Sequence, residues 1–459
     1  MTAAVRSSPL PGAPGHRRSR PGWRLLDTDV AAAAGAFGAL VVAMWVRHGG
    51  IGELGDGWAV RWTSLADLTG LAASALALAG LVLVARPRVF ERTYGLDRIF
   101  VWHRQLGGAM TVLLGLHVAT AVAAALPGRG AGGAIADLTG RLPYMAIATV
   151  GAGLAGIVTV TSLRAVRRRL AYETWYFVHL LGYAGIALAF PHEIALGTDL
   201  STDTAARWMW VLVHIGVVAT LVQGRWIRSL VAARRPLRIA KIERPSPGMV
   251  SLTLSGPGVK DLEAVAGQFF LMRPLHRDLW WQTHPFSLSA APAKGALRFT
   301  VKDRGDGSGA VHRLRRGSPI AVEGPYGVCT PDVFGGRKAL FVAGGIGIAP
   351  VRAVLETLGH DAQPVVLYRA HHERDLVHLD ELRDLAAARG GRVLTLIGPT
   401  AKLAAHDPFS PSSLRHAVPD LAERSVVVAG PERLLHAARA GLRAAGLPSN
   451  RIHFERPWW

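Results

Sequence analysis

The pattern of hydrophobic and polar positions divides this chain of 459 residues into two unlike halves. The first half holds six apolar runs, most of which reach the roughly 20 residues that a helix needs to cross the hydrocarbon of a bilayer. The runs span residues 29–46, 64–85, 99–125, 143–163, 173–196 and 205–224. The first run is the shortest and is rich in Ala and Gly. The pattern predicts a membrane α-helical bundle of six spans over residues 29–235.

The second half changes to short strand-like runs separated by Pro and Gly, which predict an antiparallel β-barrel over residues 236–335. These runs lie at 237–242, 249–254, 268–273, 297–302 and 319–323. Over residues 336–459 strands alternate with helices, which is typical of an α/β Rossmann-like nucleotide domain. Its predicted strands are 338–343, 364–369, 392–397 and 425–429, and its predicted helices are 349–358, 378–389 and 432–446.

The charge distribution supports a membrane protein. The net charge is +20 and the mean hydropathy is +0.25. Seventeen arginines flank one set of span ends, and only five flank the other set. This bias is a topology signal that predicts a multi-pass protein of the cell membrane with both termini in the cytoplasm. It also explains why basic residues outnumber acidic ones, so no nucleic-acid partner is predicted. Residues 1–28 are predicted to be a disordered basic arm.

Four histidines inside two of the spans are the first candidates for a functional site. Ligand-type residues within spans are costly and usually functional. His103 and His117 are 14 residues apart in the third span, and His179 and His192 are 13 apart in the fifth. These spacings correspond to about 21 and 20 Å along a helix. Both spans run in the same direction, so we expect His103 to face His179 and His117 to face His192.

Two such pairs could clamp two stacked haems. Each bis-histidine haem would pass electrons without an open position on its iron. With Cys329 as the sole cysteine, a four-cysteine iron–sulfur cluster within the chain is excluded. One difficulty is that 13 residues do not return to the same helix face, and Pro191 could kink the helix to turn His192 inward. Alternatively, the four histidines are separate polar residues that satisfy contacts between helices. His214, in the sixth span, could take part in haem or acceptor binding or form a structural hydrogen bond.

The second half carries five short motifs. Three of them lie in the predicted barrel: His284-Pro285-Phe286-Ser287-Leu288-Ser289, the segment from Val301 to Ser308, and Gly324-Pro325-Tyr326-Gly327. In the nucleotide domain, an apolar strand leads into a glycine turn over residues 344–350. Glycines let a pyrophosphate approach the backbone, and a helix N-terminus favours its charge. A second turn follows at Gly430-Pro431.

In this order the motifs resemble those of the ferredoxin–NADP reductase family. With six spans and two histidine pairs in front, the chain resembles the ferric reductase and NADPH oxidase superfamily over residues 29–457. The resemblance implies FAD, NADPH or NADH, and two b-type haems as cofactors. The four span histidines would be the haem ligands. No catalytic residue is assigned.

The resemblance also implies roles for individual residues. The segment from His284 to Ser289 would bind the flavin, and Lys302, Gly305 and Ser308 would bind its pyrophosphate. Gly344, Gly345, Gly347 and Pro350 would form the nicotinamide-nucleotide turn, and Gly430 and Pro431 would lie beside the nicotinamide.

Residues at three further places in the chain bear on cofactor binding. Arg369 ends the second strand of the nucleotide domain, where with Arg374 it favours NADPH over NADH. The family's cysteine before the Gly-Pro turn is Ala429 here. Trp459 or Trp458 could stack on the flavin, or this aromatic tail could pack on the barrel.

These features predict an oxidoreductase that passes electrons from cytoplasmic NAD(P)H through FAD and two haems to the opposite face of a lipid bilayer. A ferric chelate is the favoured acceptor. The alternatives are O2, which would make superoxide, a partner protein or a quinone. Two rival interpretations are a haem-free, membrane-tethered flavin reductase and a non-enzymatic haem membrane protein.

Overall fold

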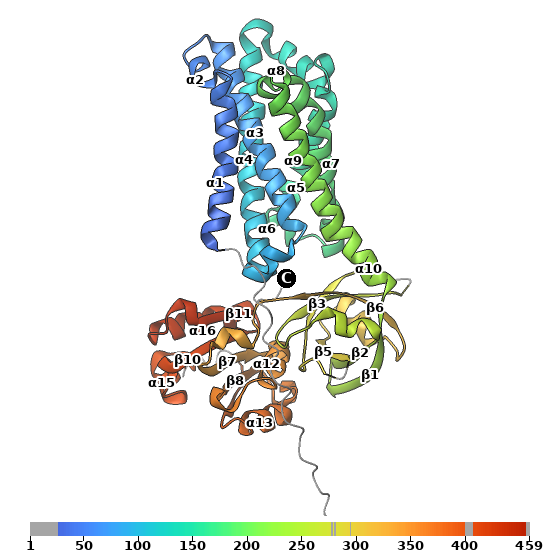
Figure 1. Ribbon diagram of the computed structural model, residues 1–459, viewed down its shortest axis with the longest axis vertical. Coiled ribbons are helices and arrows are strands. Elements are labelled where there is room, and N and C mark those ends of the chain that lie inside the picture. Colours follow the sequence, from blue (N-terminus) through green and yellow to red (C-terminus); the bar gives the residue numbers. More distant parts are fainter. Residues whose placement is uncertain (1–25, 277–278, 280, 294, 400–406, 456–459) are drawn as a thin grey trace, which may run out of the picture. The chain divides into compact units, whose positions relative to one another are not determined.

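The computed structural model describes residues 26–276, 279, 281–293, 295–399 and 407–455 (Figure 1). The chain divides into two compact units at Ile227 and Arg228. Most of the predicted N-terminal arm, and Trp458 and Trp459, lie outside the described residues.

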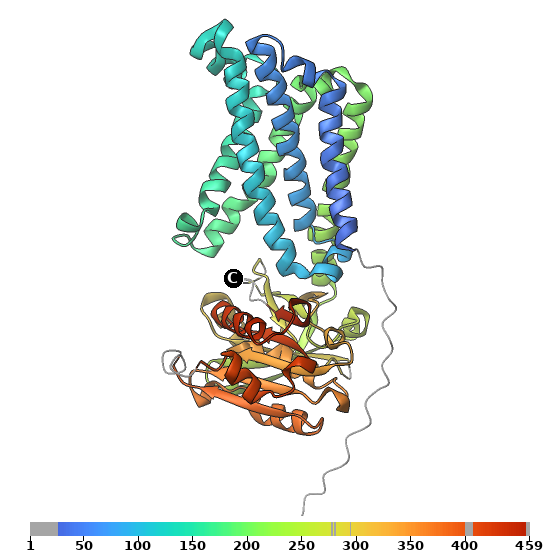
Figure 2. The same cartoon turned by 90° about the vertical axis from the view of Figure 1, so that its left-hand side faces the viewer.

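The N-terminal unit is a bundle of six long helices that run side by side (Figure 2). They are α1 (Asp27–Arg47), α3 (Trp58–Val84), α4 (Arg88–Ala136), α5 (Met145–Ser162), α7 (Tyr172–Leu196) and α9 (Thr204–Leu221). Each is long and apolar enough to cross a membrane, which confirms the six predicted spans. Their shorter connections include α2 (Gly50–Glu53), η1 (Asp137–Arg141), α6 (Arg164–Arg167) and α8 (Thr198–Thr202). α4 breaks at Gly95 and Gly130, where φ is 72° and 62°.

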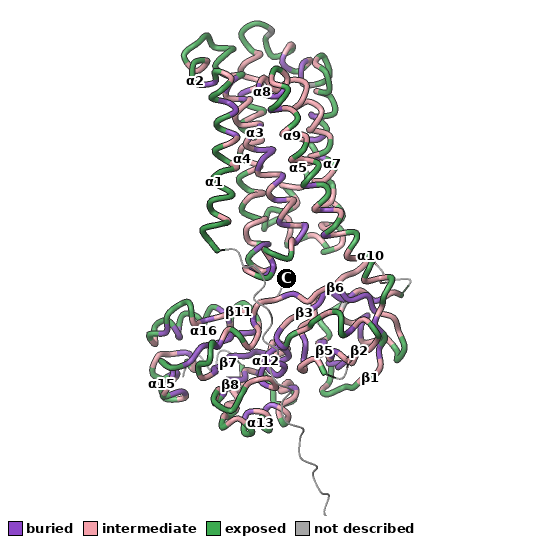
Figure 3. Tube along the Cα trace, viewed as in Figure 1, coloured by how far each residue is buried: buried purple, intermediate pink, exposed green. Residues whose placement is uncertain are grey.

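The bundle hides few of its apolar side chains, as expected of a surface that faces lipid. Its helices are mostly exposed or half-buried, whereas buried residues concentrate on the strands of the other unit (Figure 3). Val112 and Leu212, for example, are each 63% exposed. A small core surrounds Trp210 of α9, which is fully buried. α5 and α7 approach closely at Gly151, where an added Cβ would lie 2.7 Å from the Gly185 carbonyl oxygen.

The bundle unit ends with η2 (Val222–Ile227), and the second unit begins directly after it with the short helix α10 (Arg228–Arg234). An antiparallel six-stranded sheet comes next, in the order β4-β3-β6-β1-β2-β5. Its strands are β1 (Leu237–Ser246), β2 (Met249–Ser255), β3 (Phe269–Pro274), β4 (His284–Ser287), β5 (Ala296–Lys302) and β6 (Pro319–Tyr326). A bridge between Leu288 and Phe299 joins the two edge strands and closes the sheet into the predicted barrel. The short helix α11 (Asp306–His312) follows β5.

A parallel five-stranded sheet, in the order β11-β10-β7-β8-β9, forms the rest of the second unit. Its strands are β7 (Lys338–Gly344), β8 (Val365–Ala370), β9 (Arg392–Ile397), β10 (Arg424–Ala429) and β11 (Ile452–Glu455). The helices are α12 (Ile348–Leu355), α13 (Leu379–Ala387), α15 (Pro411–Ala417) and α16 (Glu432–Ala444). Buried apolar side chains on both faces of this sheet form its core, which is typical of a parallel sheet. The α/β prediction is confirmed, although β11 and α15 were not predicted.

Candidate functional sites in the bundle and the nucleotide-binding unit

The structure brings the first predicted histidine pair together across the bundle. The ring centroids of His103 on α4 and His179 on α7 are 6.1 Å apart. Nδ1 of His103 lies 3.2 Å from the carbonyl oxygen of Gly80 on α3, to which it donates. Nδ1 of His179 lies 3.4 Å from the hydroxyl of Ser162, at the end of α5. Nδ1 of each ring therefore contacts a neighbouring helix. Because the Gly80 carbonyl oxygen can only accept, Nε2 of His103 carries the lone pair that could bind a metal ion.

The second pair has the same separation. The ring centroids of His117 on α4 and His192 on α7 are also 6.1 Å apart. Nδ1 of His117 donates to the carbonyl oxygen of Ala66 on α3, at 2.9 Å. Nδ1 of His192 donates to the carbonyl oxygen of Ala189, one turn earlier in its own helix, at 2.5 Å. A carbonyl acceptor fixes the tautomer in which Nε2 carries the lone pair that binds a metal.

Both pairs fit axial ligation of a haem. Two imidazoles bound to one iron at about 2 Å each have ring centroids roughly 6 Å apart. Among the residues that the structure describes, no three His, Cys, Asp or Glu side chains form a group that could hold a metal ion. A haem needs only two protein ligands, because the porphyrin supplies the other four. The donor sets therefore suit haem better than a bare metal ion.

Two glycines of α3 make room for the α4 histidines, and the sequence analysis did not single them out. A Cβ at Gly70 would lie 2.8 Å from Nδ1 of His117, and a Cβ at Gly80 would lie 3.6 Å from Nδ1 of His103. The two glycines are ten residues apart and the two histidines 14, so the spacing in the sequence does not pair them. Only the packing of α3 against α4 identifies their role.

His179 has an aromatic neighbour that the sequence analysis also missed. The Trp175 ring stacks on the imidazole, with centroids 4.9 Å apart and an angle of 27° between the ring planes. Trp175 Nε1 donates to the same Ser162 hydroxyl, at 3.3 Å. The Arg167 guanidinium lies over the indole, 4.7 Å from its centroid. The i, i+4 spacing of Trp175 and His179 was the available signal.

His214 has no histidine opposite it among the described residues. Its Nδ1 lies 3.0 Å from the carbonyl oxygen of Trp210, one turn earlier in α9, and its ring packs on Phe190 at 4.4 Å. These contacts agree with the interpretation of His214 as a residue that forms a structural hydrogen bond.

The two glycine turns of the nucleotide domain touch each other at the carboxyl ends of β7 and β10, which are neighbouring parallel strands. A Cβ at Gly347 would lie 2.8 Å from the Cα of Gly430 and would collide with the carbonyl oxygen of Ala429. A Cβ at Gly344 would lie 2.6 Å from a methyl carbon of Leu434. Gly345 has a φ of 54°. Side chains at these positions would fill the surface over which a dinucleotide's backbone contacts are made.

The flavin motif lies on β4, at one edge of the barrel sheet. Its residues from His284 to Ser287 are half-buried and pair with β3. Gly305, with a φ of 123°, precedes α11, and the Ser308 hydroxyl accepts from the Arg304 N–H at 2.7 Å. This turn is preorganised around its own backbone, as a pyrophosphate-binding turn requires. Lys302, at the end of β5, is half-buried.

Three predicted cofactor residues lie where direct contact is restricted. Leu288 and Ser289 are fully buried in the barrel, so their side chains present no surface to a flavin. The Arg369 guanidinium donates to the carbonyl oxygens of Ala370, Leu396 and Gly398. Burial lowers the pKa of Arg369. A 2′-phosphate would have to displace these carbonyl contacts, whereas Arg374 is exposed.

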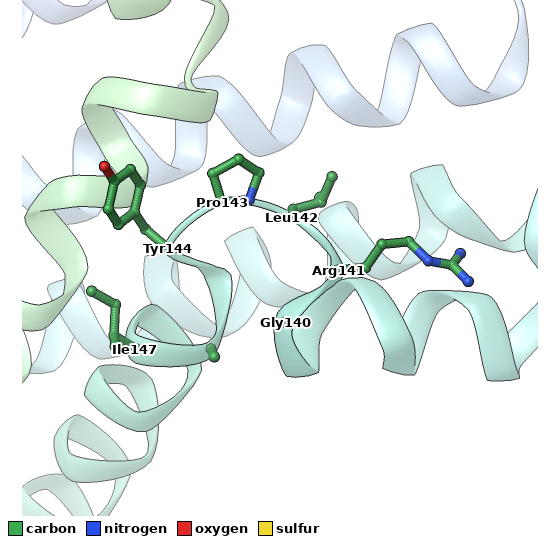
Figure 4. Close-up of a pocket in the computed structure, with 7 residues that line it drawn as sticks. Gly140, Arg141, Leu142, Pro143, Tyr144 and Ile147 are labelled. Carbon is green, nitrogen blue, oxygen red and sulfur yellow. The ribbon is translucent and has the colours of Figure 1, made fainter.

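An open hollow of about 420 Å³ lies at the turn between η1 and α5 (Figure 4). Gly140 and Pro143 line it, and Arg141 and Tyr144 extend from the turn in opposite directions. Arg141 forms an ion pair with Asp137 at 3.7 Å. The hollow contains one cationic side chain and is otherwise largely apolar.

Comparison with known proteins finds three family profiles in the order that the fold suggests. The family described as "Ferric reductase like transmembrane component" matches residues 69–190. The family described as "FAD-binding domain" matches residues 236–330, and that described as "Oxidoreductase NAD-binding domain" matches residues 341–440. The chain is therefore an NAD(P)H-dependent oxidoreductase with binding domains for FAD and the nicotinamide nucleotide.

Two sequence relatives agree with these profiles. The chain is 32% identical to "Ferredoxin--NADP reductase B" of Sorangium cellulosum over 37% of this chain and 76% of the relative. It is 27% identical to "Ferric/cupric reductase transmembrane component 2" of Saccharomyces cerevisiae, over 42% of this chain and only 26% of the relative. A solved "Ferredoxin reductase in carbazole 1,9a-dioxygenase" is 19% identical, with a TM-score of 0.41 over 48% of this chain and 68% of that one. The chain belongs to the ferric reductase and NADPH oxidase superfamily, with a ferric reductase-type membrane domain followed by ferredoxin–NADP reductase-type modules for FAD and NAD(P)H.

Proposed function

We propose that the chain carries electrons from NAD(P)H through FAD and two b-type haems to an acceptor at the opposite face of the cell membrane. The observation that carries this proposal is the matched separation of 6.1 Å in both histidine pairs. A chance arrangement of polar residues would not be expected to repeat both this separation and the occupied Nδ1 atoms at two levels of one bundle.

The residues of the second unit would position the reactants. The touching glycine turns at Gly347 and Gly430 would bring the dinucleotide close to the backbone, and β4 would hold the flavin ring. FAD accepts a hydride and can release its two electrons singly, whereas a bis-histidine haem passes one electron at a time. Each haem iron would be bound by one pair of the span histidines, which would make it six-coordinate. It would therefore exchange electrons without binding an acceptor.

The direction across the membrane is proposed from charge. The arginine-rich span ends favour the cytoplasm, which places both termini there. His103 and His179 would then form the inner haem site, and His117 and His192 the outer one. NAD(P)H is a cytoplasmic reductant, so this orientation puts the nucleotide-binding unit on the side that supplies its substrate.

For the acceptor, a ferric chelate is our first choice. The name of the Saccharomyces cerevisiae relative describes a reductase of ferric and cupric ions. NADPH is favoured over NADH because Arg374, just beyond the end of β8, is an exposed cation near the expected position of a 2′-phosphate.

Reduced-minus-oxidised absorption spectra of the detergent-purified chain test this proposal. We expect b-type haem bands with dithionite, and the same bands with NADPH alone. His103→Ala and His117→Ala should each remove one haem while FAD remains bound. A purified protein with FAD but no haem bands would instead be a membrane-tethered flavin reductase, and one with haem but no flavin would be a non-enzymatic haem protein.

A further inference from the structure

Glu193 places a carboxylate inside the bundle immediately after the outer ligand His192. Ionisable side chains in membrane spans are costly and usually have a specific partner or function. The other glutamate of α7, Glu173, lies at the opposite end of the helix, in its first turn. The environment of Glu193 shows what its side chain does.

The Glu193 carboxylate joins three helices. Its Oε2 accepts a hydrogen bond from the Ser74 hydroxyl of α3 at 3.0 Å and another from Trp210 Nε1 of α9, also at 3.0 Å. Trp210 is fully buried and stacks on Phe37 of α1, with centroids 6.3 Å apart and ring planes 9° apart. Ser74 lies one turn beyond Gly70, the glycine that makes room for His117. The junction is thus at the level of the outer histidine pair.

His192 needs an anchor of this kind more than the other three histidines do. The 13 residues between His179 and His192 would point the two rings to different sides of a regular helix. Pro191, directly before His192, also removes one backbone hydrogen bond from α7. The Nδ1 contact of His192 is made within its own helix, to Ala189, so it does not tie the ring to another span.

We propose that Glu193 is the positioning residue of the outer haem site, which fixes the direction of His192 by tying α7 to α3 and α9. This inference rests on the proposed haem-binding function. In it, the carboxylate acts as a hydrogen-bond acceptor for Ser74 and Trp210. An amide oxygen could do the same, because it also has two lone pairs. Glu193 therefore acts by accepting two hydrogen bonds at a fixed position, and its negative charge is not required.

The experiment compares full-length Glu193→Ala, Glu193→Gln and the control Glu173→Gln, purified in the same detergent. Haem content per chain, FAD content and low-temperature EPR of the oxidised haems are measured for each. We expect Glu193→Ala to lose the outer haem, or to shift its EPR signal, while the inner haem signal and FAD stay as in the wild type. Glu193→Gln should restore the wild-type spectrum, and Glu173→Gln should leave it unchanged.

Each other outcome is informative. Two unperturbed haem signals in Glu193→Ala would overturn the proposal, and so would a Glu193→Gln variant that behaves like Glu193→Ala, because charge would then be what matters. If Glu193→Ala fails to fold, Ser74→Ala and Trp210→Phe each remove one of the two hydrogen bonds and should shift the outer signal alone. A wild-type chain without haem would refute the proposed function instead, which keeps the two failures distinct.

Discussion

Gly70 and Gly80 of α3 offer a matched test of the space around the α4 histidines. An added Cβ at Gly70 would lie 2.8 Å from His117 Nδ1 and 2.9 Å from Cε1, whereas at Gly80 the nearest atom of His103 is 3.6 Å away. His117 cannot easily yield, because its Nδ1 also donates to Ala66. We therefore expect Gly70→Ala to destabilise the bundle by about 1–3 kcal/mol, as overpacking does, and Gly80→Ala to have little effect.

The measurements are the thermal unfolding temperature and the haem content of the two variants. Gly70→Ala should also weaken retention of the outer haem, since it pushes an axial ligand. Equal behaviour of the two variants would mean that the α3 glycines do not set the position of His117.

Gly347 tests the contact between the two nucleotide turns. A Cβ there would collide with the Ala429 carbonyl oxygen and so separate the turns that β7 and β10 bring together. We expect Gly347→Ala to raise the KM for NADPH about tenfold, which corresponds to ~1.4 kcal/mol of binding free energy, with FAD content unchanged. Gly359→Ala is the control, because nothing lies within 4 Å of a Cβ at that position. Loss of FAD along with NADPH binding would show that the turn supports the whole unit.

At the scale of elements, the barrel and the nucleotide domain are joined by a polar network around Glu381 of α13. The carboxylate accepts from Arg298 of β5 at 3.0 Å and from Arg352 of α12 at 2.8 Å. His378 Nδ1 lies 2.8 Å from its other oxygen, and His378 Nε2 lies 3.0 Å from the Thr300 hydroxyl of β5. One glutamate thus connects a strand of the barrel to two helices of the nucleotide domain.

This network predicts a pH dependence of stability. The hydrogen bond to His378, followed by those to Arg298 and the charge of Arg352, lowers the pKa of Glu381 well below its usual range. A carboxylate with a lowered pKa stabilises the fold above its unfolded pKa of about 4.3, and this contribution is lost as the pH falls toward the folded value. Glu381→Gln should therefore lower the unfolding temperature most at neutral pH.

The check is the thermal unfolding temperature of the wild type and Glu381→Gln between neutral and acidic pH. The difference should narrow once the pH is below the ordinary glutamate pKa. A difference that stays constant with pH would assign the effect to lost packing.

Much of this architecture follows from sequence pattern, because long apolar spans and short strand-like runs leave strong periodic signals. The six spans, the barrel and the alternating strands and helices were predicted, although α4 (Arg88–Ala136) extends well beyond both ends of the predicted run at 99–125. β4, β11 and α15 were missed because their segments are short, at four to seven residues. The roles of Gly70, Ser162 and Glu193 were missed for another reason. They depend on which helices become neighbours, and local sequence does not specify that.

The same distinction applies to the candidate sites. Spacing within one helix predicted which histidines should face each other, but it could not explain how His192 reaches the face of His179. Pro191 offers one explanation, and the contacts of Glu193 with α3 and α9 add a second that the sequence does not show. Arg369 shows the opposite case: its place at the end of β8 was predicted, but its backbone carbonyl partners were not visible in the sequence.

At the scale of the whole molecule, the decisive prediction is vectorial electron flow. Proteoliposomes can trap a membrane-impermeant ferric chelate inside while NADPH is added outside. Chains whose nucleotide-binding unit faces outward should reduce the trapped iron. His117→Ala should reduce it only at the background rate, because the outer ligand pair would be broken. The same variant should still reduce an added acceptor on the NADPH side, since FAD and the His103–His179 pair remain.

That second activity is the control that separates a broken path from a misfolded protein. A flavin reductase without haems would reduce the acceptor on the NADPH side and leave the trapped chelate oxidised in both wild type and variant. If the trapped chelate is reduced equally by His117→Ala and the wild type, electrons cross by a route that does not use His117. The four-histidine path would then be wrong, even though the six spans and the two binding modules stand.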